Sequence, residues 1–247
     1  RTMRAHAARI SDRLFRLTIR VSEALIRRGS AQGRQAWFDP REFAWTAGLE
    51  QRWSEVRREL DHVLLDRDAI PSFQDVSIEQ RAITDDNRWK TYFMFVFGTP
   101  IEVNCQRCPL TVELLQAIPG LQNAMFSILA PGKDIPEHRG PYNGVLRYHL
   151  ALKVPRDGDS CAIWVDGERR IWSEGETMIF DDSFPHRVRN DTREERVVLF
   201  ADFERPLAWP LAVINRAVLA WLAATPFVKR GLDRLLTGRF GDGVPGD

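Results

Sequence analysis

The hydrophobic pattern changes its period twice along the chain. Over residues 1–86 apolar positions recur at the three- and four-residue spacing of amphipathic helices. Over residues 87–206 they alternate with polar positions in short β-branched and aromatic runs, separated by Pro, Gly and Asp. Helical spacing returns over residues 207–247. We therefore expect an N-terminal helical region, a central β domain and a C-terminal apolar helical extension.

The central region contains a series of strand-like runs with turn signals between them. Many short strands of this kind indicate an antiparallel sandwich or barrel and not a parallel α/β sheet. Only "TVELLQAI", at residues 111–118, interrupts the series as a short helix. The runs are "TYFMFVFG", "NAMFSILAPG", "VLRYHLALKVP", "CAIWVDGERRIW", "ETMIFDD" and "ERVVLFADFERP".

The first helical pattern is basic and amphipathic. In "RISDRLFRLTIRVSEALIRR" the apolar stripe alternates with arginines on the complementary positions. Such a helix either packs on the domain or lies on a membrane surface. The stripe is Ile10, Leu14, Leu17, Val21 and Leu25, and the arginines are Arg9, Arg13, Arg16 and Arg20.

Two further helices follow from the same spacing. Residues 48–66 have an apolar stripe formed by Trp53, Val56, Leu60 and Leu64. The second, "PLAWPLAVINRAVLAWLAATPF", is unusually apolar, but Pro210 and Pro226 limit it to roughly 15 residues, whereas a bilayer span needs about 20. We expect it not to cross a bilayer.

Charge is distributed unevenly, although the formal net charge is only +1. Residues 1–30 carry eight arginines against Asp12 and Glu23, residues 205–247 are also basic, and the centre is acidic. Basic ends favour contact with an anionic surface. An acidic centre argues against nucleic acid, which prefers a continuous basic surface.

The chain has three cysteines, and this small, odd number does not favour a disulfide framework. Cys105-x-x-Cys108 has no second ligand pair nearby, so an ordinary loop pair is a better interpretation than a zinc or redox site. The sequence shows no signal peptide and begins at Arg1 rather than Met. We expect a cytoplasmic protein, peripheral on the inner face of the membrane.

His138 and His186 are two of only five histidines, and each stands at the edge of a strand beside a turn, His138 after "APGKDIPE". Imidazoles from opposite sheets of a jelly roll could meet at its open end. With open positions for oxygen and a keto acid, that is the geometry of non-haem iron(II) oxygenases. The usual carboxylate, two residues after the first histidine, is Gly140 here. By spacing alone, a buried core histidine is the better interpretation of each.

Three long blocks change that interpretation. They are "MFSILAPGKDIPEHRGPYNGVLRYHLALKVP", "CAIWVDGERRIWSEGETMIFDDSFPHRVRNDT" and "RVVLFADFERP". They resemble the aspartyl/asparaginyl β-hydroxylase family, and "DNRWKTYFMF" and "NCQRCPLTVELLQAIPG" extend the similarity to about residues 87–206. The resemblance implies a mainly β, double-stranded β-helix fold (a cupin-like jelly roll) and the use of iron(II), 2-oxoglutarate and O2.

The same resemblance implies roles for individual residues. His138 and His186 match the iron ligands, and Arg196 matches the arginine that pairs with the distal carboxylate of 2-oxoglutarate. A guanidinium suits that task because it binds a carboxylate through two parallel hydrogen bonds and stays charged when buried. The assisting hydroxyl and the pair near the keto-acid end of the co-substrate match Ser127, Arg147 and His149. Alternation along the strand places Arg147 and His149 on one face.

Gly140 departs from the common ligand triad, although peptide-modifying members of the family also show His-x-Gly. A water, oriented by Asp181 or Asp182, could fill the third position, with an ordinary turn as the competing interpretation of both residues. An open position would also admit a halide, so a halogenase is a further alternative.

"HRGPYNGVLRYHL" and "FADFERPL" look closer to the lipid A 2-hydroxylase branch than to the peptide-modifying enzymes, although that branch has Asp at the position of Gly140. We therefore expect hydroxylation of a C–H bond in a membrane lipid or acyl chain, with the terminal helices on an anionic leaflet. The alternatives are β-hydroxylation of Asp or Asn in peptides, and a non-catalytic cupin-like binding module. The terminal helices could instead pack on each other, or across a homo-oligomer.

Overall fold

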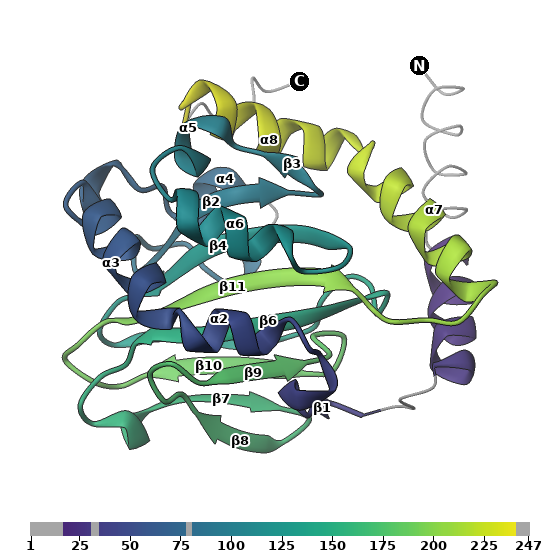
Figure 1. The fold of residues 1–247 in the computed structure, drawn as a ribbon, viewed down its shortest axis with the longest axis horizontal. Coiled ribbons are helices and arrows are strands. Elements are labelled where there is room, and N and C mark those ends of the chain that lie inside the picture. The colour runs from purple at the N-terminus through teal and green to yellow at the C-terminus, as the bar shows by residue number, and fades with distance from the viewer. Residues whose placement is uncertain (1–16, 31–34, 78–80, 241–247) are drawn as a thin grey trace.

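The structure, a computed structural model, describes residues 17–30, 35–77 and 81–240. Its centre consists of two antiparallel sheets packed face to face, with helices on one face and at one end (Figure 1). The seven-stranded sheet has the order β1 (Trp37–Phe38), β9 (Thr177–Phe180), β6 (Val145–Lys153), β11 (Arg196–Glu204), β4 (Leu121–Leu129), β2 (Trp89–Val96) and β3 (Thr99–Pro100). The four-stranded sheet has the order β5 (Lys133–His138), β10 (His186–Asn190), β7 (Cys161–Val165) and β8 (Glu168–Ile171).

Strand order identifies the architecture. The strands from β4 to β11 are shared between the sheets, with β4, β6, β9 and β11 in the larger sheet and β5, β7, β8 and β10 in the smaller. Every pairing among them is antiparallel. Eight strands interleaved in this way form a jelly roll, the arrangement of cupins. The predicted mainly β, cupin-like fold is therefore confirmed.

Helices flank the sheets, and the expected helix over residues 48–66 is two helices that meet at Arg52. A further helix, over residues 17–29, precedes β1. Three-residue 3-10 helices are η1 (Pro40–Glu42), η2 (Arg67–Ala69) and η4 (Gly158–Ser160). The α-helices after β1 are α2 (Thr46–Gln51), α3 (Trp53–Leu64), α4 (Phe73–Val76), α5 (Glu102–Cys105), α6 (Pro109–Gln116), α7 (Leu211–Ala223) and α8 (Pro226–Thr237).

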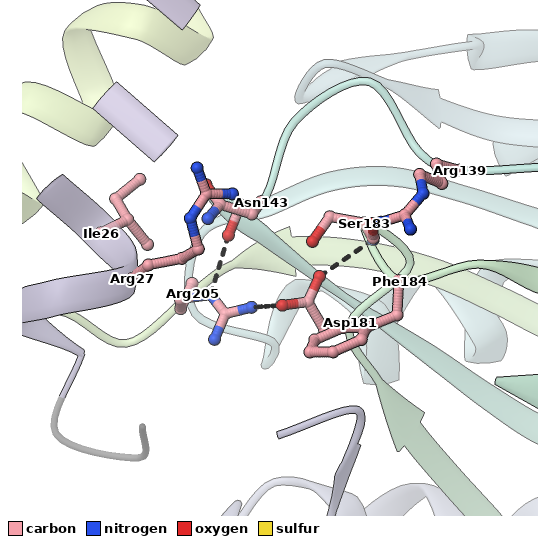
Figure 2. A pocket seen from close by; sticks show the side chains of 8 residues that line it. All are labelled: Ile26, Arg27, Arg139, Asn143, Asp181, Ser183, Phe184 and Arg205. Atoms are coloured by element: carbon pink, nitrogen blue, oxygen red, sulfur yellow. Dashed lines mark hydrogen bonds and ion pairs between the residues drawn. The ribbon is translucent and has the colours of Figure 1, made fainter. Parts of the chain in front are cut away.

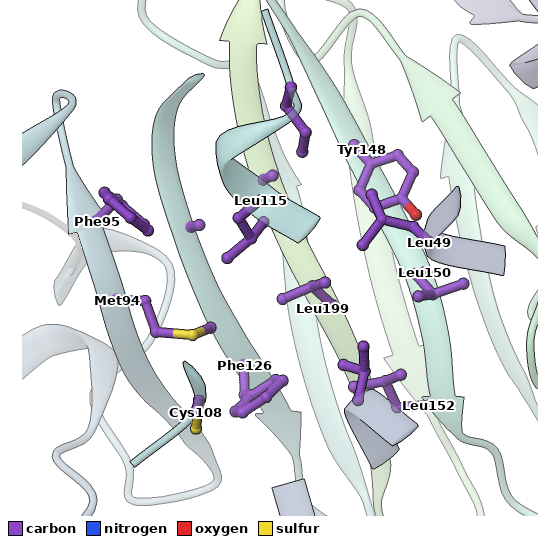
Figure 3. Packing of buried hydrophobic residues seen from close by; sticks show 14 of the residues in the cluster. Leu49, Met94, Phe95, Cys108, Leu115, Phe126, Tyr148, Leu150, Leu152 and Leu199 are labelled. Carbon is purple, nitrogen blue, oxygen red and sulfur yellow. The ribbon is translucent and has the colours of Figure 1, made fainter. Parts of the chain in front are cut away.

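Alternation along the central strands builds two separate apolar layers. In β6, Tyr148 and Leu150 pack with Leu199 of β11 in a cluster that also takes Leu49 of α2 and Leu115 of α6 (Figure 3). Arg147 and His149 point the opposite way, toward the smaller sheet, as the sequence predicts. Fully burying one such leucine contributes about 1.5–3 kcal/mol, so a one-residue slip of β6 would be strongly unfavourable. The register of β6 is what orients the polar pair.

The helix over residues 17–29 lies beside α7 (Figure 1). Ile26 packs with Val218 and Leu219 of α7, so the two terminal regions do contact each other. Leu17 and Val21 nevertheless remain at least half accessible to solvent, at 58% and 50%. The first half of the predicted basic helix, including Arg9, Arg13 and Arg16, lies outside the described residues.

Within the described part of the chain, no single helix is both long and apolar enough to span a membrane. The helices α7 and α8, bent by 60° at the break between them, meet the length and composition requirement only when they are taken together.

The division of the chain at residues 86 and 206 stays a prediction. The helices α2 and α3, which lie before residue 86, share an apolar cluster with the larger sheet.

Candidate active site

Six side chains singled out in the sequence line one cavity between the two sheets. They come from five strands: β4, β5, β6, β10 and β11. Apolar side chains such as Phe180 and Phe200 fill the space around them. The six are Ser127, His138, Arg147, His149, His186 and Arg196.

His138 and His186 face each other across neighbouring strands. They are direct partners in the β5–β10 pairing, and their ring centroids lie 4.1 Å apart. The expectation that they come from opposite sheets is wrong, because both belong to the four-stranded sheet. The segment before His138, read from the sequence as a turn, is mostly strand β5. A bulge between His186 and Val188 bends β10 at this point, a device that re-aims a side chain at a strand end.

Both imidazoles have one ring nitrogen already engaged. Nδ1 of His138 lies 2.8 Å from the carbonyl oxygen of Pro136, and Nδ1 of His186 lies 3.0 Å from that of Phe184. A carbonyl oxygen can only accept, so each Nδ1 carries the hydrogen and each Nε2 is left with its lone pair. This is the arrangement by which proteins orient histidine ligands for a metal.

Burial keeps these histidines neutral. It lowers the pKa of His186 to about 3, with the positive charge of Arg147 adding to the effect. Burial, opposed by the carbonyl of Pro136, also lowers the pKa of His138. Neutral imidazole is the form that binds a metal. Among the described residues the two histidines stand as a pair, since no group of three or more His, Cys, Asp or Glu side chains there could hold a metal ion.

Gly140, which stands where the family's common carboxylate would be, faces the carboxylate of Asp182. A Cβ added at Gly140 would overlap the oxygens of that carboxylate. Asp182 is buried and pairs with Arg147 at 2.8 Å, while its Oδ1 has no hydrogen-bond partner among the described residues. Burial raises the pKa of Asp182, and Arg147 opposes that rise.

Arg147 lies between two carboxylates. Its Nε donates a hydrogen bond of 2.9 Å to Asp202, in addition to the ion pair with Asp182, and its guanidinium covers the ring of Phe200 at 4.4 Å. The sequence analysis missed Asp202. The signal was present, because Asp202 is the one acidic residue inside the apolar run "RVVLFADF" of β11. Arg147 thus forms one wall of the cavity with its charge already compensated.

Asp181, the other candidate for orienting a water, belongs to a different cavity. Its carboxylate accepts hydrogen bonds from the Arg205 guanidinium and, at 2.9 Å, from the backbone N–H of Ser183 (Figure 2). That cavity is also lined by Arg27, Arg139 and Asn143, and it contains neither His138 nor His186. The expected role of Asp181 at the metal has no support in this geometry.

Arg196 is 2% exposed and has no carboxylate partner among the described residues. One Nη donates to the backbone carbonyl of Ser127 at 3.4 Å, the guanidinium lies 4.6 Å from the ring centre of Trp172, and Nε has no partner. Burial lowers the pKa of Arg196 to about 10, which leaves it charged at neutral pH. A buried, uncompensated cation is costly, so this geometry calls for an anionic ligand.

His149 and Ser127 complete the cavity. Both ring nitrogens of His149 are buried without a partner among the described residues, and the ring lies 5.3 Å from that of Phe200. Burial, helped by the nearby charge of Arg196, lowers the pKa of His149 well below its usual value. The Ser127 hydroxyl accepts a 3.0 Å hydrogen bond from the indole N–H of Trp89. These unpaired donors and acceptors are aimed at a polar ligand inside an apolar shell.

Comparisons with known proteins identify the family. Residues 50–206 match the model of the aspartyl/asparaginyl β-hydroxylase family. The chain is 44% identical to an ornithine lipid ester-linked acyl 2-hydroxylase of Rhizobium tropici, over 90% of this chain and 79% of that protein. It is 32% identical to the mouse aspartyl/asparaginyl β-hydroxylase over 71% of this chain, but it spans only 24% of that protein.

The protein is an enzyme of the hydroxylase class, and the chain belongs to the aspartyl/asparaginyl β-hydroxylase family. Among solved structures, the cupin domain of an XRE-family transcriptional regulator from Enterobacter cloacae matches 48% of this chain and 99% of its own, with a TM-score of 0.34 and 17% identity. Because that likeness is low, the fold assignment rests on the strand order described above.

Proposed function

We propose that the cavity binds iron(II) and 2-oxoglutarate, and that the protein is a dioxygenase that hydroxylates the acyl chain of a membrane lipid. The observation that carries the proposal is the facing pair of neutral imidazoles, His138 and His186, each with Nδ1 engaged and Nε2 left for a ligand. When bound, the metal and co-substrate supply oxidative decarboxylation, which activates O2 for insertion into a C–H bond.

The buried polar side chains fit the co-substrate. Arg196 would hold the distal carboxylate of 2-oxoglutarate, because its guanidinium is buried, charged and without a carboxylate partner in the described chain. Ser127, close to Arg196, and His149 would meet the rest of the molecule. Arg147, held by two carboxylates, would shape the wall and contact the keto-acid end only if Asp182 or Asp202 releases it.

The protein's own part is to position the reacting atoms and to exclude water. Phe180 and Phe200 line the cavity beside the two imidazoles, so a reacting carbon would be surrounded by apolar side chains. The third position on the metal has no carboxylate from residue 140, since that residue is glycine. A water or another small ligand would complete the coordination there, and a halide is the alternative that the sequence leaves open.

For the substrate, we propose the ester-linked acyl chain of an ornithine lipid, hydroxylated at C2. The support is the 44% identity to the R. tropici enzyme, which extends over 90% of this chain and 79% of that protein. Side chains of Asp or Asn in peptides are the second candidate. The mouse relative favours it by name, but the similarity covers only a quarter of that protein.

We further propose that the protein works on the cytoplasmic surface of an anionic membrane. Trp209, 81% exposed, and Val213 leave an apolar surface on and before α7, and Leu17 and Val21 leave another on the neighbouring helix. Arginines and lysines around these helices would add attraction of about 1 kcal/mol each to acidic lipids.

The direct test is an incubation of purified protein with iron(II), ascorbate, 2-oxoglutarate and O2. Ornithine lipids in mixed micelles are compared with Asp- and Asn-containing peptides, and mass spectrometry locates any added oxygen. The proposal predicts succinate formation with one oxygen atom gained at C2 of the ester-linked chain. Oxygen on the peptides alone would contradict the lipid substrate, and no succinate with either would contradict the dioxygenase.

A further inference from the structure

A second, largely apolar cavity of about 200 Å³ adjoins the candidate active site. Its outer wall is α8, which lies across the end of the larger sheet near β2 and β3 (Figure 1). The floor is made by side chains of β2 and β4, including Phe93 and Met125. We call this cavity the α8 groove.

The α8 groove lies next to the candidate active site and shares two side chains with it. Arg147 and Phe200 line both the α8 groove and the cavity that contains His138 and His186. The guanidinium of Arg147 lies over the Phe200 ring, so these two side chains form the partition between the spaces. A ligand in the α8 groove therefore ends next to the place where the reacting carbon must stand.

The polar groups at the inner end of the α8 groove are already paired with one another. Asp202 accepts hydrogen bonds from Arg147 at 2.9 Å and from the Asn123 amide at 3.1 Å. Apart from Ser77, the rest of the lining is apolar or glycine. Such a lining favours a hydrocarbon over an extended peptide, whose backbone donors and acceptors would lose their hydrogen bonds to water.

The helix α8 presents small or apolar residues to the α8 groove. Val228 and Gly231 stand one turn apart, and Phe227, 39% exposed, stands at the outer end. At Gly231 an added Cβ would meet the backbone oxygen of Val76 at 3.4 Å, which is ordinary contact. An alanine fits there, and any larger side chain must enter the groove or move α8.

We propose that the α8 groove binds the hydrocarbon tail of the acyl chain that is hydroxylated, and that Gly231 determines how long a tail it accepts. The substrate class rests on the proposed function above. The acyl carbon next to the ester would lie by the two imidazoles, and the tail would pass Phe200 and run along α8. Phe227 would stand where the tail leaves the protein.

The first test measures binding without turnover. The probe is a polyene fatty acid whose fluorescence rises in apolar surroundings, titrated into the full chain and into Gly231→Ala, Gly231→Phe and Val228→Trp. Each excluded methylene weakens binding about fourfold, so the two bulky variants are expected to bind at least about tenfold more weakly. Gly231→Ala is expected to weaken binding less than either bulky variant does, and the exposed control Lys229→Leu is expected to bind as the wild type does.

Thermal unfolding and the absorption band of iron(II) with 2-oxoglutarate show whether each variant remains folded with its metal site intact. A Gly231→Phe protein that passes both checks and binds the probe as tightly as wild type would overturn the proposal. If instead the bulky variant loses its fold, Gly231→Leu and Val228→Phe repeat the test with smaller side chains.

The second test uses ornithine lipids with ester-linked chains of graded length. Gly231→Phe is expected to move the preferred length to shorter chains, whereas Phe227→Ala is expected not to shorten the preferred length. Unchanged length preference in Gly231→Phe would contradict the groove while the hydroxylase stands. Probe binding that depends on Gly231, with no lipid hydroxylated by wild type, would support the groove and contradict the proposed substrate.

Discussion

Gly140 and Asp182 compete for one small volume beside Arg147. The backbone N–H of Gly140 donates a 2.7 Å hydrogen bond to the carbonyl of Asp182, and the Asp182 carboxylate occupies the space into which a side chain at residue 140 would grow. The carboxylate uses that space to pair with Arg147. The glycine that breaks the common ligand pattern is thus explained by a buried ion pair next to the candidate active site.

Gly140→Ala is expected to destabilise the protein by about 1–3 kcal/mol, the usual cost of overpacking a buried site. In the background of Asp182→Ala the same change should cost much less, because the overlapping oxygens are gone. Urea unfolding of the two single variants and the double variant measures this coupling. Gly158→Ala is the control, since nothing lies within 4 Å of its added Cβ and its backbone is unstrained. Equal costs of Gly140→Ala in both backgrounds would refute the explanation.

Arg196→Met should separate stability from co-substrate binding. Replacing a buried, uncompensated guanidinium by an apolar side chain is expected to be neutral or to stabilise the apoprotein by about 1–4 kcal/mol. In the wild type, 2-oxoglutarate at a hundred times its Kd should add about 2.7 kcal/mol to the free energy of unfolding, and Arg196→Met should lose that increment. Thermal unfolding with and without iron(II) and 2-oxoglutarate measures both effects. A variant that is strongly destabilised yet keeps the increment would contradict the assignment. Arg58→Met, at an exposed site, is the control.

Much of the β architecture is visible in the sequence because alternation is a local property. Alternation alone predicts the two faces of β6 correctly. Tyr148 and Leu150 lie on the core face, and Arg147 and His149 lie on the face that lines the cavity. The strand β5 was missed because "KDIPEH" carries three charged side chains and a proline, and only its pairing with β10 makes it a strand.

The site was less predictable than the strands. Spacing alone does not distinguish His138 and His186 from core histidines. Only the resemblance to the aspartyl/asparaginyl β-hydroxylase family indicates them as candidate metal ligands. Their position on neighbouring strands of one sheet depends on how the whole chain is wound, which no local pattern contains. The pairing of Arg147 with Asp182 and Asp202 is likewise a contact between distant segments.

The three thiols should be unreactive in the folded protein. Cys105, Cys108 and Cys161 are all buried, and burial raises the pKa of Cys108 to about 12 and raises those of the other two. Since the thiolate is the reactive form, a raised pKa slows alkylation, and the reaction should stay slow until the pH is well above the ordinary thiol range. We expect iodoacetamide at pH 8 to label the protein only in denaturant, as measured by intact mass. Fast labelling of Cys105 or Cys108 in the native state would instead favour a redox or metal role for that pair.

Membrane contact predicts binding to vesicles that weakens with salt. Wild type should co-sediment with liposomes containing phosphatidylglycerol, and added salt should release it because charges at the surface are screened. Trp209→Ser combined with Val213→Ser should lower the partition coefficient by about tenfold through lost apolar burial. Leu65→Ser is the matched control, because Leu65 is as exposed as Trp209 but lies at the end of α3. An equal loss in the control and the double variant would argue against a specific membrane-facing surface.

The central claim is that His138 and His186 together hold the iron that binds 2-oxoglutarate. The most direct measurement is anaerobic addition of iron(II) and 2-oxoglutarate, recording the weak metal-to-ligand charge-transfer band in the visible range. Wild type and His62→Ala, an exposed histidine on α3, should both show the band. His138→Ala and His186→Ala should lose it while remaining folded. A band that survives either substitution, or that is missing from folded wild type, would contradict the claim.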